Sequence, residues 1–361
     1  MKILIIANNS SGLFAFREAL IRKLIEKGNE VFACVPFGAD IDKLSEMSIV
    51  LLPIDINRRG VNAAEDLKLL IDINHIVSKI QPDYIITYTI KPNIYGGIVS
   101  RIHRIPYAAN VTGLGTAFEK KGIVQLVATM LYKVGLKDVK VCFFENAGDC
   151  EVAKRKRLFA GGRAVVLAGA GVDVNKYTFR KLNDKNPTTK FLFIGRIMKE
   201  KGINELFDAM RRLVTEGQNC CLHVLGGMEE DYKSVINECE SEGWLYYHGF
   251  QADVLPFIYA SDCFVLPSWH EGMANVNLEN AACGRPIITS NIPGCKEAVT
   301  DGVSGYLCES KNADSLYRAM KRFIELSDRE RSEMGKAGRQ LMVEKFNKAT
   351  VVENTIAALG L

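Results

Sequence analysis

Two carboxylates give the segment 267–286 the clearest chemical signal in this sequence. Glu271 stands in a glycine-containing loop after an apolar strand expected at 263–266, and Glu279 lies inside the helix that this loop should open. The first turn of such a helix offers unpaired backbone N–H groups to an anion. The segment therefore combines two acids with an anion-binding backbone.

The spacing of these two acids fits a nucleotide sugar. At about 1.5 Å per helical residue, the carboxylates of Glu271 and Glu279 should lie roughly 10 Å apart. This is about the distance from the ribose of a nucleotide to the sugar beyond its diphosphate. We expect ribose hydroxyls on one carboxylate, phosphates on the amides, and the sugar near the other carboxylate.

Two cations are expected to join this site from the loop 195–202. Arg196 and Lys201 follow an apolar strand expected at 191–194, so a strand end and a helix start bring both side chains to one edge of a sheet. Fixed cations at that edge can neutralise a diphosphate as it leaves. A basic surface loop is the alternative interpretation.

A loop at 8–13 follows the first strand, which is expected at 2–7. Gly12 permits close approach of the backbone to a phosphate at the start of the next helix. The loop is not G-x-G-x-x-G, so the fingerprint of a dinucleotide-binding dehydrogenase is absent. Any tight turn between a strand and a helix has a similar pattern.

Three further loops are candidates for ligand contacts. Lys91 lies just past a strand expected at 83–87, where it can bind the phosphate of an acceptor or serve as a surface charge. The loop 112–115 contains two glycines, which favour close approach of the backbone to a ligand. The loop 248–251 can make backbone contacts to a base.

The histidines and cysteines do not favour a catalytic metal. The ten cysteines include no C-x-x-C pair, and we expect them to be buried thiols. No i, i+4 histidine pair and no H-E-x-x-H motif occurs among the five histidines, which are His75, His103, His223, His248 and His270.

Strands alternate with helices of about 10–15 residues along the chain, which predicts parallel sheets covered by helices on both faces. At 361 residues, the chain is too long for one ordinary core. The polar segment 180–190 is typical of an interdomain linker. We therefore expect an α/β fold of two doubly wound domains, 1–180 and 181–345, that face each other across a cleft. A C-terminal helix at 346–361 can pack back on the first domain.

Positive charge gathers in the first half, where residues 1–180 carry 25 Lys and Arg against 17 Asp and Glu. This half contains the apolar segment 122–137, flanked by Lys120, Lys121, Lys137 and Lys140. An apolar helix beside basic residues can lie on an anionic membrane surface, and a core helix with solvated ends is the alternative. No apolar run is long enough for a transmembrane helix, and the start of the chain is expected to be a buried strand and not a signal peptide.

Taken together, these segments resemble the GT-B-fold retaining glycosyltransferases of family four. The matching motifs are the loop 195–202, the two glutamates Glu271 and Glu279, and the turn 169–173. The resemblance covers essentially the whole chain. The segments 91–96 and 112–115 are similar to the branch that builds capsules and lipid-linked oligosaccharides. Members of that branch add a hexose or N-acetylhexosamine to an undecaprenyl-diphosphate-linked sugar.

The resemblance implies a retaining, metal-independent hexosyltransferase with a UDP-sugar donor, a lipid-linked saccharide acceptor, no cofactor and no nucleic-acid partner. It also implies a cytoplasmic enzyme that associates peripherally with the inner face of the plasma membrane. The implied catalytic residues are Arg196, Lys201 and Glu271. The implied donor-binding residues are Gly12, Gly195, Arg196, Lys201, Phe250, Glu271, Gly272, Met273, Ala274, Asn275 and Glu279. The implied acceptor-binding residues are Arg17, Lys91, Asn93, Thr112 and Gly113.

Two positions depart from the family pattern. Ala274 stands where many members have proline, and the loop 113–115 lacks the histidine that touches the donor sugar. Two other functions are compatible with the sequence. An enzyme similar to UDP-N-acetylglucosamine 2-epimerase would need no acceptor, whereas a non-enzymatic protein would only bind a nucleotide sugar or a nucleic acid. The spacing of the two glutamates and the basic, apolar segment 120–140 favour the transferase, and no stacking platform for nucleic acid is evident.

Overall fold

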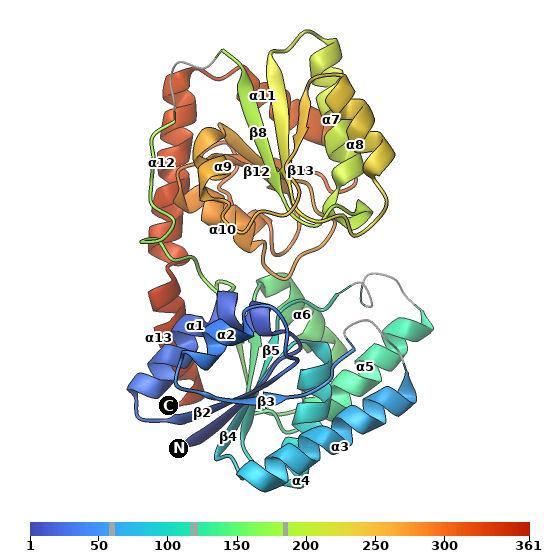
Figure 1. The fold of residues 1–361 in the computed structure, drawn as a ribbon, viewed down its shortest axis with the longest axis vertical. Helices are drawn as coiled ribbons and strands as arrows, with labels where there is room; N and C mark the ends of the chain where they lie inside the picture. The colour runs from blue at the N-terminus through green and yellow to red at the C-terminus, as the bar shows by residue number, and fades with distance from the viewer. Residues whose placement is uncertain (58–61, 116–117, 119–121, 183–186) are drawn as a thin grey trace. The chain divides into compact units, whose positions relative to one another are not determined.

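The computed structural model describes residues 1–57, 62–115, 118, 122–182 and 187–361. In these residues the chain forms two compact units, one of residues 1–170 and 348–361 and the other of residues 171–347. Each unit is a parallel sheet with helices packed on it (Figure 1). The chain passes from the first unit to the second between Ala170 and Gly171, which is before the boundary expected at residue 180.

The first unit contains a seven-stranded sheet in the order β3-β2-β1-β4-β5-β6-β7, and every pair of neighbours is parallel. Its central strands are apolar runs that are buried on both faces, as a parallel sheet requires. The strands are β1 (Lys2–Ile6), β2 (Glu30–Val35), β3 (Val50–Pro53), β4 (Tyr84–Tyr88), β5 (Tyr107–Val111), β6 (Val141–Phe144) and β7 (Arg163–Val166).

Helices cover both faces of this sheet and enclose a separate core on each face. One face is covered by α1 (Ser10–Glu26), α2 (Ile41–Ser45) and the C-terminal helix α13 (Lys348–Leu359). The C-terminal helix packs along α1, where Lys23 Nζ lies 3.1 Å from Glu353 Oε1. The other face is covered by α3 (Ala63–Ile80), the π-helix η1 (Pro92–Gly96), α4 (Gly97–Ile102), α5 (Ile123–Gly135) and α6 (Ala147–Lys156).

The second unit contains a six-stranded parallel sheet in the order β10-β9-β8-β11-β12-β13. Its strands are β8 (Thr189–Ile194), β9 (Cys220–Leu225), β10 (Leu245–Tyr247), β11 (Cys263–Leu266), β12 (Ile287–Ser290) and β13 (Gly305–Cys308). Its helices are the 3-10 turn η3 (Lys199–Lys201), α7 (Ile203–Thr215), α8 (Lys233–Ser241), α9 (Leu255–Ala260), α10 (Asn275–Ala282), the 3-10 turn η4 (Lys296–Ala298), α11 (Ala313–Ile324) and α12 (Asp328–Lys345).

Buried arginine contacts hold the segment that enters the second unit. The guanidinium of Arg285 is fully buried and donates to the backbone carbonyls of Ser261 at 3.0 Å and of Arg180. Arg339 donates from α12 to the carbonyl of Tyr177 at 2.7 Å. Backbone carbonyls accept from both terminal nitrogens of Arg285, which offsets part of the cost of burying its charge, whereas its Nε has no hydrogen-bond partner among the described residues. All ten cysteines are free and buried, as predicted.

Candidate functional site

The strand order of the second unit brings the two predicted donor loops together. The chain leaves β8 toward β9 on one side, whereas β11 lies on the other side of β8. Ligands bind at such a switch point, outside the carboxyl ends of the strands. Gly195 and Arg196 follow β8, and the segment from Pro267 to Glu271 follows β11. The loop with the predicted cations and the loop with the first predicted acid therefore lie side by side at the carboxyl edge of this sheet.

Lys201 and Glu271 form an ion pair at this switch point. The Lys201 ammonium contacts Glu271 Oε1, and the two side chains are only 19% and 14% exposed. The Ser268 hydroxyl, which is fully buried, donates to the same carboxylate oxygen at 2.8 Å. An ammonium carries three N–H donors, so the contact with Glu271 leaves Lys201 with two further donors. Glu271 is thus fixed by two donors from different parts of the chain.

Direct backbone contact holds the two loops in register. Gly202 has a φ of 73°, and a Cβ added to it would lie 2.1 Å from the carbonyl oxygen of Pro267. The Trp269 N–H donates to the carbonyl of Glu200 at 2.9 Å, and its indole N–H donates to Glu205 at 3.1 Å. Only glycine fits this approach, because any side chain would separate Lys201 from Glu271.

Some of the backbone N–H groups at the start of α10 already donate hydrogen bonds within the protein. The N–H of Ala274 donates to the carbonyl of Gly294 at 2.7 Å, and that of Asn275 donates to the carbonyl of Met273 at 3.0 Å. Met273 and Ala274 are also buried. We predicted that the backbone from Gly272 to Asn275 would bind the donor phosphate. In this structure two of those amides already have protein acceptors, because the loop packs against Gly294.

Glu279 is the fifth residue of α10, just past its first turn, and is half-buried. Tyr177 is its neighbour. Burial, together with the charge of Glu279 and a hydrogen bond to it, raises the pKa of the Tyr177 hydroxyl. The sequence did not point to Tyr177, because it comes from the segment between the sheets and follows no strand.

The remaining donor candidates of this unit lie on its surface. The side chain of Arg196 is 52% exposed, with one guanidinium nitrogen 3.5 Å from Glu229. Phe250 is 79% exposed and follows Gly249, whose φ is 64°. An exposed aromatic ring beside a left-handed glycine can stack on a planar ligand such as a base. Both side chains are therefore free to reach a ligand at the carboxyl end of the sheet.

In the first unit, the switch point lies between β1 and β4, and Gly12 stands beside it in α1. The Gly12 N–H donates to the Asn9 side chain at 2.9 Å, which caps the helix. A Cβ added to Gly12 would meet nothing closer than 3.7 Å. The fold therefore does not require glycine here, although glycine weakens a helix by about 1 kcal/mol relative to alanine. A ligand that approaches the backbone would account for it.

Arg17 is almost buried and pairs with an acid that we did not predict. Its Nη2 lies 2.6 Å from Glu145 Oε1, and its guanidinium stacks 4.8 Å from the centre of the Tyr88 ring. Burial raises the pKa of Glu145, and the charge of Arg17 opposes this shift. Glu145 directly follows β6, so an acid after an apolar strand was the signal that could have found it.

Asn93, which we predicted to contact an acceptor, lies inside the first unit. Asn93 is fully buried; its side chain accepts from Thr87 at 2.7 Å and donates to the carbonyl of Asn110 at 2.9 Å. The π-helix η1 turns this side chain inward, where it joins the strand ends. Lys91 is 15% exposed and pairs with Asp66 at 2.7 Å, so its charge is already balanced inside the unit.

Thr112 and Gly113 are partly exposed just past β5. Gly113 has a φ of 135°, a conformation that favours glycine. The next residue, Leu114, is buried and its N–H points to Asp149 Oδ2 at 3.3 Å. Asp149 therefore helps to hold this loop at the carboxyl edge of the sheet.

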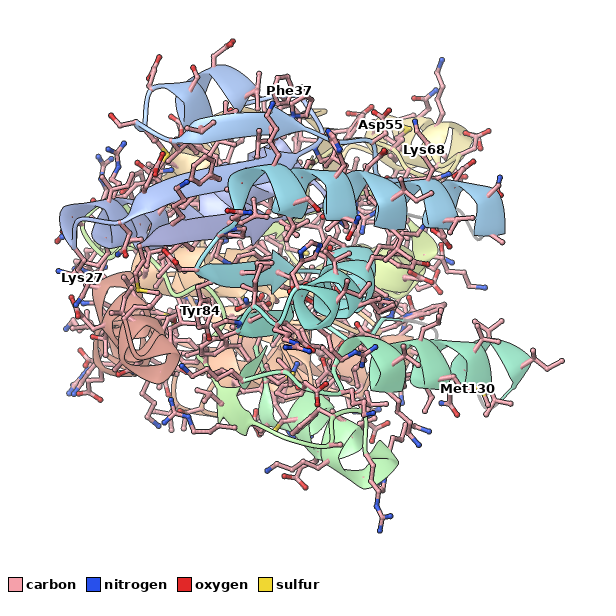
Figure 2. The ribbon with its side chains drawn as sticks, turned by 90° about the horizontal axis from the view of Figure 1, so that it is seen from below. Lys27, Phe37, Asp55, Lys68, Tyr84 and Met130 are labelled. Atoms are coloured by element: carbon pink, nitrogen blue, oxygen red, sulfur yellow. The ribbon has the colours of Figure 1, made fainter. Side chains whose placement is uncertain are left out.

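The helix α5 has an apolar outer side. Its buried anchors are Tyr132 and Gly135, whereas seven large apolar side chains on it are at least 37% exposed. Figure 2 labels Met130 on this helix. The exposed residues are Ile123, Val124, Leu126, Val127, Met130, Leu131 and Val134. A core helix is thereby excluded for this segment. The predicted flanking residues Lys120 and Lys121 lie outside the described residues.

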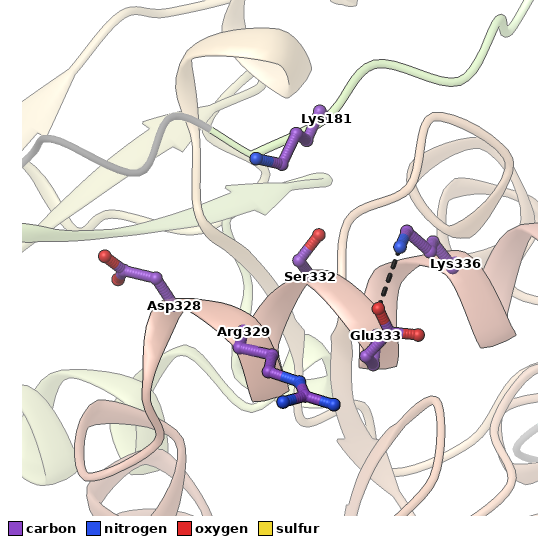
Figure 3. Close-up of a pocket in the computed structure, with 6 residues that line it drawn as sticks. All are labelled: Lys181, Asp328, Arg329, Ser332, Glu333 and Lys336. Carbon is purple, nitrogen blue, oxygen red and sulfur yellow. Dashed lines mark hydrogen bonds and ion pairs between the residues drawn. The ribbon is translucent and has the colours of Figure 1, made fainter.

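Within the described part of the chain, none of the helices has the length and apolar character needed to cross a membrane. A polar pocket of about 450 Å³ lies elsewhere in the second unit (Figure 3). It is lined by Lys181 and, along α12, by Asp328, Arg329, Ser332, Glu333 and Lys336. None of the predicted site residues lines it.

The described residues contain no group of three or more His, Cys, Asp or Glu side chains that could hold a metal ion.

Comparison with known proteins extends these observations. Residues 175–341 match the family model of glycosyl transferases group 1, and residues 2–148 match that of glycosyl transferase 4-like proteins. A Campylobacter jejuni relative, N,N'-diacetylbacillosaminyl-diphospho-undecaprenol alpha-1,3-N-acetylgalactosaminyltransferase, is 26% identical over 90% of both chains. An Escherichia coli relative, UDP-Gal:alpha-D-GlcNAc-diphosphoundecaprenol alpha-1,3-galactosyltransferase, is 26% identical over 80% of this chain and 78% of its own. The fold is similar to that of Anabaena HepE in complex with UDP and glucose, with a TM-score of 0.81, 19% identity, and coverage of 100% of this chain and 99% of that chain.

Proposed function

The chain belongs to the GT-B-fold glycosyltransferases whose two halves these family models describe, and we propose that it transfers a hexose or N-acetylhexosamine from a UDP-sugar to an undecaprenyl-diphosphate-linked saccharide. The observation that carries this proposal is the Lys201–Glu271 pair at the switch point of the second unit. Further support comes from the two relatives, whose names specify acceptors linked to undecaprenol through a diphosphate.

In this proposal the second unit binds the donor. Lys201 and Arg196 bind the diphosphate, Glu279 binds ribose hydroxyls, and Glu271 binds the transferred sugar. Phe250 lies beside the base. In the first unit, Thr112 and Gly113 are the proposed acceptor contacts, and Gly12 remains a predicted phosphate contact. Asn93 is fully buried, and Arg17 and Lys91 reach an acceptor only by leaving Glu145 and Asp66.

The proposed reaction retains the configuration of the transferred sugar. The acceptor hydroxyl forms a bond to the anomeric carbon from the face that UDP leaves, while the bond between that carbon and the phosphate oxygen breaks. The acceptor proton passes to the leaving phosphate. Lys201 and Arg196 stabilise the negative charge that develops on the diphosphate, so catalysis rests on positioning and charge stabilisation. Glu271 is a sugar-positioning group and not half of a hydrolytic acid/base pair.

We also propose that no metal ion or other cofactor takes part, because Lys201 and Arg196 supply the charge that a metal would provide. Activity should therefore survive excess EDTA. Complete loss of activity with EDTA, reversed by Mg²⁺ or Mn²⁺, would contradict this part of the proposal.

The outer side of α5 is the proposed membrane contact. Exposed apolar side chains on a helix that also carries Lys133 can insert into the headgroup region of an anionic bilayer. Burying one such side chain is worth about 1.5–3 kcal/mol, so several together give stable binding. The variant Val127→Asp/Met130→Asp should sediment less with phosphatidylglycerol vesicles. Unchanged sedimentation of the variant would contradict this assignment.

The transferase is tested by offering UDP- and GDP-sugars together with undecaprenyl-diphosphate-linked saccharides, and by measuring the product mass and anomeric configuration. The expected product is an acceptor extended by one sugar with its configuration retained. Turnover of a UDP-sugar without any acceptor, to its 2-epimer, would instead identify an epimerase. Nucleotide-sugar binding with no turnover under any condition would identify a binding protein.

A further inference from the structure

Ser268 is buried directly beneath the Glu271 carboxylate. It is fully inaccessible, lies two residues past the end of β11, and donates its hydroxyl to Glu271 Oε1 at 2.8 Å. The same oxygen accepts from Lys201. Both donors therefore hold the same oxygen of the Glu271 carboxylate.

The two donors that hold Glu271 differ in what a substrate does to them. A donor diphosphate competes with Glu271 for the Lys201 ammonium, because phosphate oxygens are strong acceptors for a cation. Ser268 is closed off from any ligand by its burial, so its hydrogen bond persists when the diphosphate arrives. A side chain that must stay aligned during reaction needs such a supporting contact.

We propose that Ser268 is a positioning residue of the donor site. Its hydroxyl keeps the Glu271 carboxylate aimed at the transferred sugar while Lys201 engages the diphosphate. The proposal rests on the proposed function, since it assigns a role within the donor site. The proposal distinguishes recognition of the sugar from recognition of UDP. Ser268 supports recognition of the sugar through Glu271 and has no part in recognition of UDP.

This separation gives a direct test. Ser268→Ala removes the hydroxyl, Ser268→Cys keeps most of the volume with a much weaker donor, and Ser268→Thr keeps the hydroxyl. Ser261→Ala is the matched control, because Ser261 is also a buried serine of the second unit but donates to the carbonyl of Ile258 at 2.9 Å. For each variant, the dissociation constant of UDP and the kcat and KM for the UDP-sugar are measured.

Ser268→Ala and Ser268→Cys should lower kcat/KM for the UDP-sugar by about 10-fold or more, the effect of losing a hydrogen bond to a charged group. Their UDP dissociation constants should match that of the wild type, which also shows that the unit is folded. Ser268→Thr should restore activity, and Ser261→Ala should leave it unchanged. In a Glu271→Ala background, which removes the acceptor of the Ser268 hydroxyl, the effect of Ser268→Ala should shrink because the two groups act as one unit.

Parallel weakening of UDP binding and kcat/KM would overturn the proposal, because Ser268 would then only support the fold. A full effect of Ser268→Ala in the Glu271→Ala background would overturn it as well, because Ser268 would then act independently of Glu271. A wild-type chain that binds no UDP would overturn the proposed function itself. That outcome is distinct from the other two, in which the wild type binds UDP and transfers sugar.

Discussion

Replacing Gly202 by alanine tests whether backbone contact between two loops places Lys201 next to Glu271. Gly202 ends the turn η3, begins α7 and has a φ of 73°. The added Cβ would lie 2.1 Å from the carbonyl oxygen of Pro267, whereas real Cβ atoms essentially never come closer than 3.0 Å. The two loops must therefore separate by about 1 Å.

Two separate effects lower the free energy of unfolding of Gly202→Ala, and the displacement of the loops lowers its turnover. A left-handed φ costs an alanine about 1–2 kcal/mol relative to glycine. Relief of the overlap adds about 1–3 kcal/mol, the usual penalty of overpacking. A misplacement of about 1 Å at a reacting site can cost 10²-fold in rate, so turnover should decrease by about 10- to 100-fold. Gly202→Ala should thus be both less stable and much less active.

Gly217→Ala is the matched control in the same unit. Gly217 has a φ of 77°, but a Cβ added to it would meet nothing within 4 Å. Gly217→Ala should lose only the stability that the left-handed φ costs, about 1–2 kcal/mol, and should keep its turnover. Urea unfolding gives the free energy of unfolding of each variant, and sugar transfer gives its turnover. Equal stability and equal turnover in the two variants would refute the reasoning.

Three further predictions follow from the same structure. Lys201→Ala should lower turnover by about 10²-fold or more, the scale for removing a preorganised charge-stabilising group, and near-normal turnover would refute its role. Asn93→Ala should lower the free energy of unfolding by about 1–3 kcal/mol, because it removes two buried side-chain hydrogen bonds, from Thr87 and to the carbonyl of Asn110. An unchanged urea midpoint would contradict this. Burial, with smaller contributions from His248 and Lys190, lowers the pKa of His223 to about 4. The unfolded chain therefore binds a proton below pH 6.5 that the folded chain binds only near pH 4, so stability should fall as pH drops through this window. The free energy of unfolding is measured with urea at pH 7 and at pH 5. Between these two pH values, it should decrease less for His223→Gln than for the wild type.

Much of the fold could be predicted because local pattern and tertiary role agree. Central strands such as β1 and β11 are continuous apolar runs, and the helices between them carry one apolar side, so both elements are evident from the sequence. Strand β3 was missed because it is a half-exposed edge strand that ends in Pro53. The short strand β13 was missed as well, because it begins at Gly305 and contains only four residues.

The site was predictable to the extent that its residues follow strands. In a parallel sheet, residues after strand ends share one edge, so Lys201 and Glu271 could be placed together although 70 positions separate them. The same reasoning applied to Asn93, which also follows a strand, yet its side chain is buried. Whether such a side chain points to the edge or into the core depends on the path of the next turn, and here a π-helix directs it inward.

The sequence by itself therefore determined the class of fold and the family, and it located the two loops proposed to bind the donor, because these depend on periodicity and on motifs that are local in the chain. The tertiary structure alone decided which polar groups are free to act. It paired Arg17 with Glu145, paired Lys91 with Asp66, and placed Ser268 under Glu271. The first two of these contacts join residues far apart in sequence, and burial decides the third, so no local pattern encodes them. The chemistry of each group follows from these neighbours.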